Sequence, residues 1–150
     1  MCLFLQREEC IVCGKKGEKH HIVFKSQNGL DFPLNYVYLC SEHHRGKNGP
    51  HKNRIVDIGY KLEMQEKLYK ILNKEFYNIE QLMQLLNLNY SQAKTICKKH
   101  KLSKEGYKKS EIIKTLMGDT IYYEFMLDEY YDNSWQINED FENTYFALGE

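Results

Sequence analysis

The sequence predicts an α+β protein: a small β-hairpin module stapled by metal, then a helical, helix-turn-helix-like region, then an acidic aromatic tail. Three observations predict this fold class. Cysteine and histidine pairs gather near the N-terminus, a period close to 3.6 residues begins near Ile55, and Lys and Arg are absent after residue 118. We therefore expect a metal-binding module over residues 1–57, a helical region over 58–118 and a C-terminal segment over 119–150.

The expected hairpin rests on two short β-prone runs. HHIVF spans residues 20–24 and LNYVYL spans 34–39, and the segment between them contains the turn formers Asn28, Gly29 and Pro33. We expect these runs to be the two strands, and GKNGP (46–50) to be a second loop.

Helical periodicity extends from Ile55 to Leu72 and resumes in three shorter stretches. These are IEQLMQLL (79–86), SQAKTICKKH (91–100) with Ser91 as its expected N-cap, and SEIIKTLMG (110–118), which ends at Gly118. The first two have the outline of a helix-turn-helix, whose second helix would place Lys94, Lys98 and Lys99 against DNA. A plain helical hairpin packed on its neighbours explains the same pattern.

Charge is distributed unevenly, although the chain has 21 basic and 21 acidic side chains. Residues 1–118 hold every Lys and Arg and 12 of the acids, so they form a basic body. Lys and Arg displace counterions from phosphates, and a basic body therefore suits a nucleic acid partner. An ordinary solvated surface accounts for these charges equally well.

The C-terminal segment combines acids with aromatic side chains. Its aromatic residues are Tyr122, Tyr123, Phe125, Tyr130, Tyr131, Trp135, Phe141, Tyr145 and Phe146. Disordered acidic tails are poor in aromatics, so we expect this one to pack on the basic body or on another protein.

No apolar run approaches the roughly 18 residues that a bilayer-spanning helix needs. The apolar start of MCLFLQREEC is too short for a signal peptide and meets Arg7 at once. We therefore expect no membrane partner, a cytoplasmic location and reduced thiols, for which paired spacings favour metal binding over disulfides.

Two pairs of residues have the spacing of a structural Zn²⁺ site. Cys10-x-x-Cys13 supplies two thiolates, and Cys40-x-x-His43 repeats the spacing with one imidazole. Two such pairs separated by a hairpin predict a tetrahedral Cys₃His site. Its metal would supply folding free energy to a hairpin too small to bury an adequate core.

Four further histidines, His20, His21, His44 and His51, remain beside this site. His20 and His21 are adjacent on an expected strand, so their side chains point to opposite faces. We therefore expect the two side chains to have different roles, one as a metal ligand and the other as a base. The alternative is a zinc knuckle that only folds and binds, with these histidines as polar packing.

The arrangement resembles the HNH nucleases, which have a ββα-metal fold, and is most similar to their phage and Firmicute members. The resemblance covers about residues 10–54. The matching residues are His20-His21-Ile22, Asn35 in NYVYLC, Leu39-Cys40-x-x-His43-His44 and Gly49-Pro50-His51.

The resemblance implies that His20, His44 and His51 bind a catalytic divalent ion, that His21 is the general base, and that Asn35 holds the hairpin loop and orients His21. An all-histidine site extends the candidate ions from Mg²⁺ to Mn²⁺, Ni²⁺ or Zn²⁺. The basic residues expected to contact flanking phosphates are Lys25, Arg45, Lys47, Lys52 and Arg54.

The function that follows is a metal-dependent DNA endonuclease in a bacterial or phage-infected cell, hydrolysing phosphodiester bonds by the one-metal ββα mechanism. One alternative is a protein-binding regulator whose acidic tail imitates DNA, for instance a phage-encoded inhibitor of a host defence nuclease. Another is a transcription factor that binds DNA without cutting it. The sequence leaves the oligomeric state open.

Overall fold

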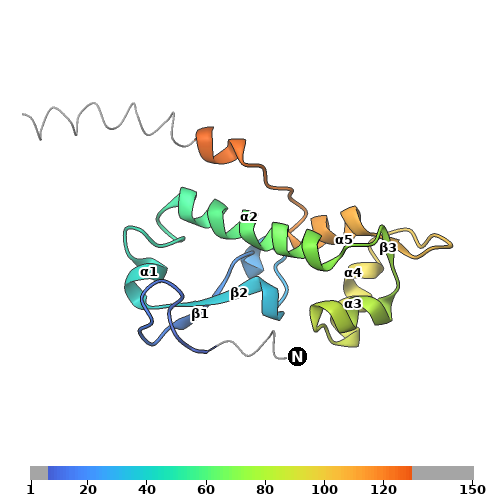
Figure 1. The fold of residues 1–150 in the computed structure, drawn as a ribbon, viewed down its shortest axis with the longest axis horizontal. Coiled ribbons are helices and arrows are strands. Elements are labelled where there is room, and N and C mark those ends of the chain that lie inside the picture. The colour runs from blue at the N-terminus through green and yellow to red at the C-terminus, as the bar shows by residue number, and fades with distance from the viewer. Residues whose placement is uncertain (1–6, 130–150) are drawn as a thin grey trace, which may run out of the picture.

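The structure, a computed structural model, describes residues 7–129 and has an α+β fold with two small antiparallel sheets. Figure 1 shows the long helix α2 lying over a hairpin, with the helices of residues 79–116 gathered at its far end. The elements are β1 (Glu18–His21), η1 (Lys25–Gln27), η2 (Pro33–Asn35), β2 (Tyr36–Leu39), α1 (Ser41–Arg45), α2 (Arg54–Ile71), β3 (Phe76–Tyr77), α3 (Ile79–Leu86), α4 (Tyr90–Cys97), β4 (Tyr107–Lys108) and α5 (Lys109–Leu116).

The hairpin is shorter than the sequence predicts. Strands β1 and β2 pair antiparallel, with His20 opposite Val37 and His21 opposite Tyr36. The expected strand over residues 20–24 ends at His21, because the backbone of Val23 bonds the Asn35 side chain instead of a neighbouring strand. The 3₁₀ turns η1 and η2 fill the connection between the strands.

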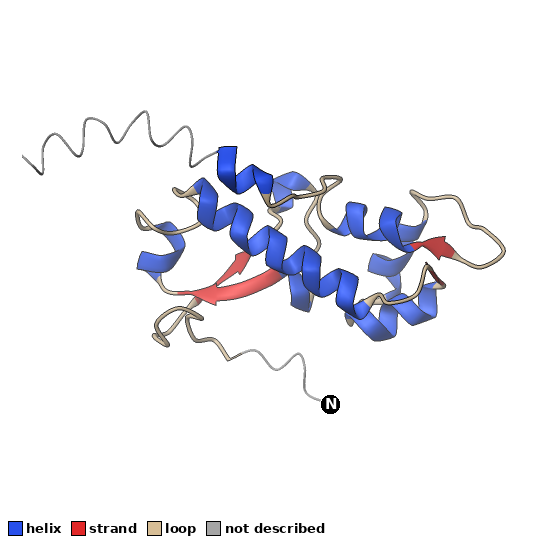
Figure 2. Ribbon diagram, turned by 45° about the horizontal axis from the view of Figure 1, so that its top comes forward, coloured by secondary structure: helices blue, strands red, loops and turns tan. Residues whose placement is uncertain are grey.

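Helix α2 joins the hairpin to the remaining helices (Figure 2). Its N-cap is Asn53, whose side chain accepts hydrogen bonds from two backbone N–H groups of the first turn. Its buried residues Met64 and Leu68 belong to a core that runs from Ile22 in the hairpin to Tyr122 near the end of the described chain. Because α2 begins at Arg54, it crosses the segment boundary expected at residue 58 and contributes to one continuous core.

The three short helices confirm the predicted helical stretches, with corrections at the ends of α4. The N-cap of α4 is Asn89 and not Ser91, because Asn89 forms a reciprocal capping box with Gln92, and the helix ends at Cys97 instead of His100. Helix α5 ends at Leu116, and Gly118 follows in the left-handed region with φ of 73°. Strands β3 and β4 were not predicted, since each has only two residues.

After α5 the chain returns to α2. Tyr122 is buried, and the Gln65 side chain bonds both its backbone N–H and its backbone carbonyl. The expected packing of the aromatic tail is therefore seen at Tyr122, whereas Tyr123 and Phe125 stack on each other at the surface. The rest of the tail, residues 130–150, lies outside the described residues.

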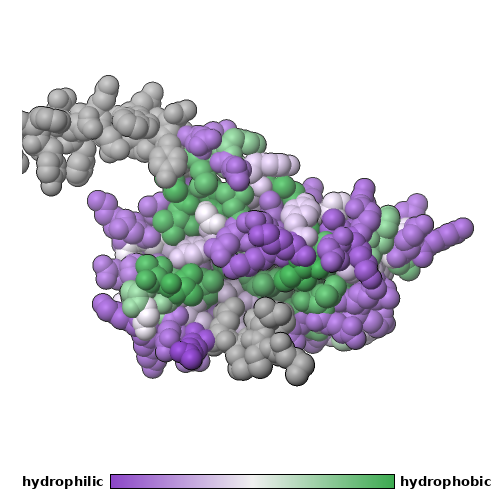
Figure 3. Space-filling model, viewed as in Figure 1, coloured by the Kyte–Doolittle hydropathy of each residue, from purple (hydrophilic) through white to green (hydrophobic). Residues whose placement is uncertain are grey.

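One face of the molecule combines hydrophilic and hydrophobic surface around α2. Figure 3 shows hydrophilic residues along the helix and hydrophobic residues on both sides of them. None of the helices within residues 7–129 is long and apolar enough to cross a membrane.

Candidate metal centres and histidine site

The first cluster joins the N-terminal knuckle to the start of α1. Cys10 and Cys13 lie in a tight turn closed by the hydrogen bond from the Gly14 N–H to the Cys10 carbonyl, and Gly14 has a φ of 73°. Cys40 follows β2 as the N-cap residue of α1, which places His43 one turn along that helix. The donor atoms of Cys10, Cys13, Cys40 and His43 all lie within 4.8 Å of one another.

The distances between these donors fit a tetrahedral ion. Cys13 Sγ lies 3.7 Å from Cys40 Sγ, and His43 Nδ1 lies 3.3 Å from Cys40 Sγ and 3.5 Å from Cys10 Sγ. With Zn–S bonds of about 2.3 Å and Zn–N bonds of about 2.0 Å, tetrahedral neighbours are roughly 3.5–3.8 Å apart. A sulfur separation of 3.7 Å is also far too long for a disulfide. The cluster can therefore hold a metal ion such as zinc.

The environment of Cys10 favours the thiolate that a metal requires. Burial by itself would raise the pKa of this thiol, but hydrogen bonds from the backbone N–H groups of Cys40, Val12 and Cys13 and from His43 lower the pKa to about 6. A thiol with this pKa is mostly ionised at neutral pH, and thiolate is the form that binds metal.

The second cluster collects three histidines from three different segments. His20 comes from β1, His44 from α1 and His51 from the turn between α1 and α2. Their candidate ligand atoms lie within 4.8 Å of one another, and the Nε2 atoms of His44 and His51 are 3.0 Å apart. His20 and His44 are buried and His51 is exposed, so the cluster opens to solvent on one side.

Two observations indicate that a cation fits here. Within the described residues, the Nε2 atom of His20 is the only buried side-chain nitrogen or oxygen without a hydrogen-bond partner. The Nδ1 atom of His44 lies 3.3 Å from the Glu18 carboxylate, which places the proton of that ring on Nδ1 and its lone pair on Nε2, facing His51. A carboxylate behind a ligating imidazole is the usual arrangement around protein-bound metals.

The same burial keeps the rings of His20 and His44 neutral. Burial, together with the nearby His44 and His51, lowers the pKa of His20 to about 3. Burial also lowers the pKa of His44, with a further lowering by His51, while the Glu18 carboxylate acts in the opposite direction. Neutral imidazoles are the form that binds metal, and therefore these two rings are in their binding form at neutral pH.

Phe24 packs on one side of the histidine cluster. Its ring stacks on His51 at 5.3 Å and meets His20 edge-on at 5.7 Å. The buried Lys61 lies 4.8 Å from the centre of the same ring and forms an ion pair with the buried Asp57. Phe24 thus contacts two of the candidate ligands and the buried lysine.

The two residues expected to be catalytic lie close to this cluster. His21, next to His20 on β1, lines the same pocket as the three histidines of the cluster, and its Nε2 atom lies 3.1 Å from Asp31 Oδ1. Asn35 is fully buried, and its side chain bonds the backbone of Val23 and Leu30, which ties the hairpin loop together. The side chain that contacts His21 is thus Asp31, whereas the bonds of Asn35 are to the loop backbone.

The basic residues expected to contact phosphates are all exposed. Lys25 lines a pocket of about 380 Å³ together with Lys19, Ser26 and the histidines. Arg45 pairs with Glu18, and Arg54 pairs with Asp57. The remaining candidates, exposed on the loop after α1 and on α4 or the residues that follow it, are Lys47, Lys52, Lys94, Lys98 and Lys99.

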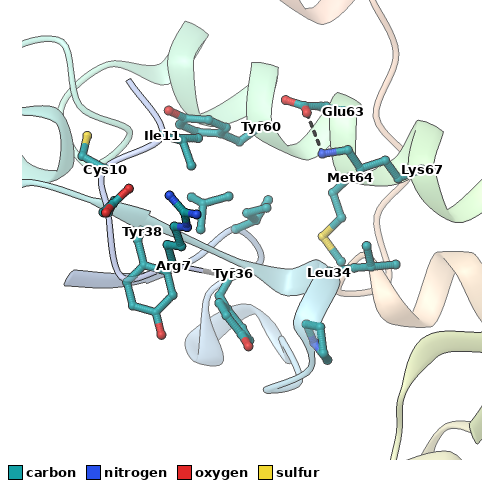
Figure 4. A pocket seen from close by; sticks show the side chains of 14 residues that line it. Arg7, Cys10, Ile11, Leu34, Tyr36, Tyr38, Tyr60, Glu63, Met64 and Lys67 are labelled. Carbon is teal, nitrogen blue, oxygen red and sulfur yellow. Dashed lines mark hydrogen bonds and ion pairs between the residues drawn. The ribbon is translucent and has the colours of Figure 1, made fainter. Parts of the chain in front are cut away.

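A separate cavity of about 600 Å³ lies between the cysteine knuckle, β2 and α2. Figure 4 shows Tyr36 and Tyr38 on its β2 side and Tyr60 and Met64 on its α2 side. Neither His21 nor Asn35 lines it, so it lies apart from the histidine site.

Three residues around the histidines were missed in the sequence. Glu18 had a detectable signal, because it lies two residues before His20 and therefore on the same face of the strand. Phe24 and Asp31 had no such signal in the sequence, since their segments were predicted only as a strand end and a turn.

Comparison with protein-family models, with curated proteins and with solved structures returned no match to this chain. The residues and their geometry are therefore the basis for assigning a function.

Proposed function

We propose that this protein is a metal-dependent DNA endonuclease of the HNH type, which hydrolyses phosphodiester bonds with one catalytic ion. The observation that carries the proposal is the convergence of His20, His44 and His51 beside His21. Three imidazoles open to solvent on one side would bind an ion with room left for a substrate oxygen, unlike the four-donor cysteine cluster.

The two centres have different roles in this proposal. A structural Zn²⁺ on the cysteine cluster fixes the start of α1, and this orients His44, which directly follows the ligand His43. A divalent ion on the histidine cluster would supply Lewis-acid stabilisation of the charge that develops on the leaving oxygen. Mg²⁺, Mn²⁺, Ni²⁺ and Zn²⁺ are the candidates, and an all-imidazole set favours the softer ones.

His21 acts as the general base. A neutral imidazole accepts a proton from the attacking water, the water oxygen bonds to phosphorus, and the bond from phosphorus to the leaving sugar oxygen breaks. The leaving oxygen then takes a proton from solvent. The exposed position of His51 and the neighbouring Lys19 and Lys25 would allow a DNA phosphate to approach from the open side.

Helix α4 and the residues after it extend the DNA-contacting surface. Lys94, Lys98 and Lys99 are exposed, whereas Ala93 and Ile96 are buried on the opposite side of the helix. Phosphate contacts from such residues position a protein on a duplex without specifying its sequence. This surface is shared with the transcription-factor alternative, and cleavage distinguishes the two functions. The regulator alternative rests on a tail that lies largely outside the described residues.

The test is a plasmid-nicking assay with each of the four ions. We expect cleavage by the wild type, a loss of about 100-fold or more for His21→Ala, and unchanged metal content in that variant. His100→Ala is the matched control, because His100 is a half-buried histidine that bonds Thr115 away from both clusters. An enzyme inactive with every ion, or a fully active His21→Ala variant, would rule the proposal out.

A further inference from the structure

Among the described residues, the side chain of His21 has one hydrogen-bonding partner, the carboxylate of Asp31. The Nε2 atom of His21 lies 3.1 Å from Asp31 Oδ1. A carboxylate only accepts hydrogen bonds, so this contact places the ring proton on Nε2 and leaves the lone pair on Nδ1. The tautomer and the orientation of a histidine base are commonly set in this way by the group that holds its other nitrogen.

We propose that Asp31 is the positioning residue for His21, and that it holds the ring with Nδ1 free to accept the proton of the attacking water. The inference deepens the nuclease proposal and rests on it for the role of His21 as a base. Asp31 acts through His21 and does not itself touch the substrate.

The loop that carries Asp31 is fixed on both sides of this residue. The neighbouring Leu30 carbonyl accepts a 2.7 Å bond from Asn35, and the next residue, Phe32, is buried in the core. The Asp31 carbonyl accepts a 2.8 Å bond from the side chain of Gln92. A carboxylate on an anchored backbone can orient its partner, whereas a surface ion pair on a free loop contributes little.

Charge at the Asp31 carboxylate is maintained by its neighbours. Burial alone would raise its pKa, but hydrogen bonds from His21 and Lys19 lower the pKa below the ordinary value. Lys19 Nζ lies 3.4 Å from the same oxygen that contacts His21.

Gln92 connects this arrangement to the helical region. Its Oε1 atom caps the start of α4 by accepting from the Asn89 N–H, while its Nε2 atom donates to Asp31. The helix proposed to contact DNA is thus hydrogen-bonded directly to the loop that holds the base. Substitution Gln92→Glu keeps the capping acceptor and removes the donor to Asp31, so it isolates the second contact.

The first readout does not depend on nuclease activity. In ¹⁵N-labelled, zinc-loaded protein we expect the His21 Nε2–H proton to be visible by NMR and slow to exchange with water, with its assignment made by His21→Gln. Asp31→Ala should abolish this signal, and Gln92→Glu should weaken it. A signal that persists in Asp31→Ala would overturn the proposal.

The second readout is cleavage. We expect Asp31→Ala to lower kcat about 10- to 100-fold with KM for DNA changed less than about twofold, because only base orientation is lost. Asp31→Asn keeps an acceptor oxygen and should recover part of kcat, whereas a purely electrostatic role would make Asn and Ala equivalent and would refute positioning. Glu66→Ala, which removes an exposed acid paired with Lys70, is the control and should cleave like the wild type.

The two readouts separate the proposals. If no ion supports cleavage by the wild type, the nuclease function fails, and loss of the Nε2–H signal in Asp31→Ala still establishes Asp31 as the group that positions His21. If the wild type cleaves DNA and Asp31→Ala retains full kcat, the nuclease function stands and the positioning role is lost.

Discussion

The Nε2 atoms of His44 and His51 lie 3.0 Å apart, although six residues and the end of α1 separate the two histidines. A helix would not bring residues at this spacing together, so the turn after Arg45 makes the contact. Gly49 is buried in this turn, and its N–H donates to the Gly46 carbonyl. The geometry of the histidine cluster therefore depends on a glycine that binds nothing itself.

Gly49→Ala should weaken metal binding at the histidine cluster. A Cβ atom at residue 49 would lie 2.5 Å from the His44 carbonyl oxygen and 2.6 Å from its carbon, so the backbone must shift. We expect affinity for the second ion to fall about 10-fold or more while the cysteine cluster keeps its zinc. Gly59→Ala is the control, because a Cβ there meets nothing within 4 Å and should stabilise α2 by up to about 1 kcal/mol. Isothermal titration calorimetry would check this, and equal affinities in the two variants would contradict it.

Removal of the cysteine-bound metal should unfold the hairpin end of the molecule. Apart from Val37 and Tyr60, the residues packed around this end are Cys10, Leu39 and Cys40, a core too small to hold without the metal. Structural zinc contributes apparent binding free energies of about 10–16 kcal/mol in small domains. We expect Cys13→Ser or a chelator to lower the Tm and abolish bound zinc. The control is Cys97→Ala, because Cys97 is a buried cysteine outside the cluster. This variant should keep the zinc of the cysteine cluster, as measured by mass spectrometry.

Breaking the buried ion pair of α2 should be more damaging than removing it entirely. Lys61 Nζ lies 2.8 Å from both carboxylate oxygens of Asp57, and both side chains are buried. Asp57→Leu alone leaves an unpaired buried ammonium and should cost about 3–5 kcal/mol. The double variant Asp57→Leu/Lys61→Met removes both charges and should recover most of that loss. Urea denaturation of the two variants measures the difference, and equal stabilities would argue against the pair being desolvated.

Acid should destabilise the metal-free histidine cluster. The pKa of His20 is about 3 in the folded protein because the ring is buried. In the unfolded chain it has the ordinary value of about 6.5, so between these pH values the unfolded state binds more protons. The free energy of unfolding should therefore fall as the pH decreases through this window, by up to about 1.4 kcal/mol per pH unit. Denaturation at several pH values should show a shallower slope for His20→Gln, and identical slopes would refute the assignment.

Much of the architecture is predictable because it depends on local spacing. Two donors separated by two residues come together within one turn, whatever the rest of the fold does. This spacing predicted the cluster of Cys10, Cys13, Cys40 and His43. Helical period predicted α2 and α3 in the same way, because the residues that each helix buries recur at helical spacing.

The burial of Lys61 is a feature that local spacing does not predict. Its position between apolar residues of α2 is typical of a solvated lysine, yet the side chain is fully buried. Asp57, one turn earlier, and the Phe24 ring provide the charge and the contact that make burial possible. Neither effect is visible in the pattern, since Phe24 arrives from a distant segment of the chain.

The sequence by itself determined the α+β class, the first donor cluster and the pool of spare histidines. The resemblance implied that His20, His44 and His51 form one set, and the tertiary structure brings their ligand atoms within 4.8 Å of one another. Only the tertiary structure decided that Glu18 lies behind His44 and that Asp31 contacts His21. Contacts of this second kind depend on where loops close and how the core packs them. Side chains ten or more residues apart along the chain become neighbours only through that packing, which no local pattern records.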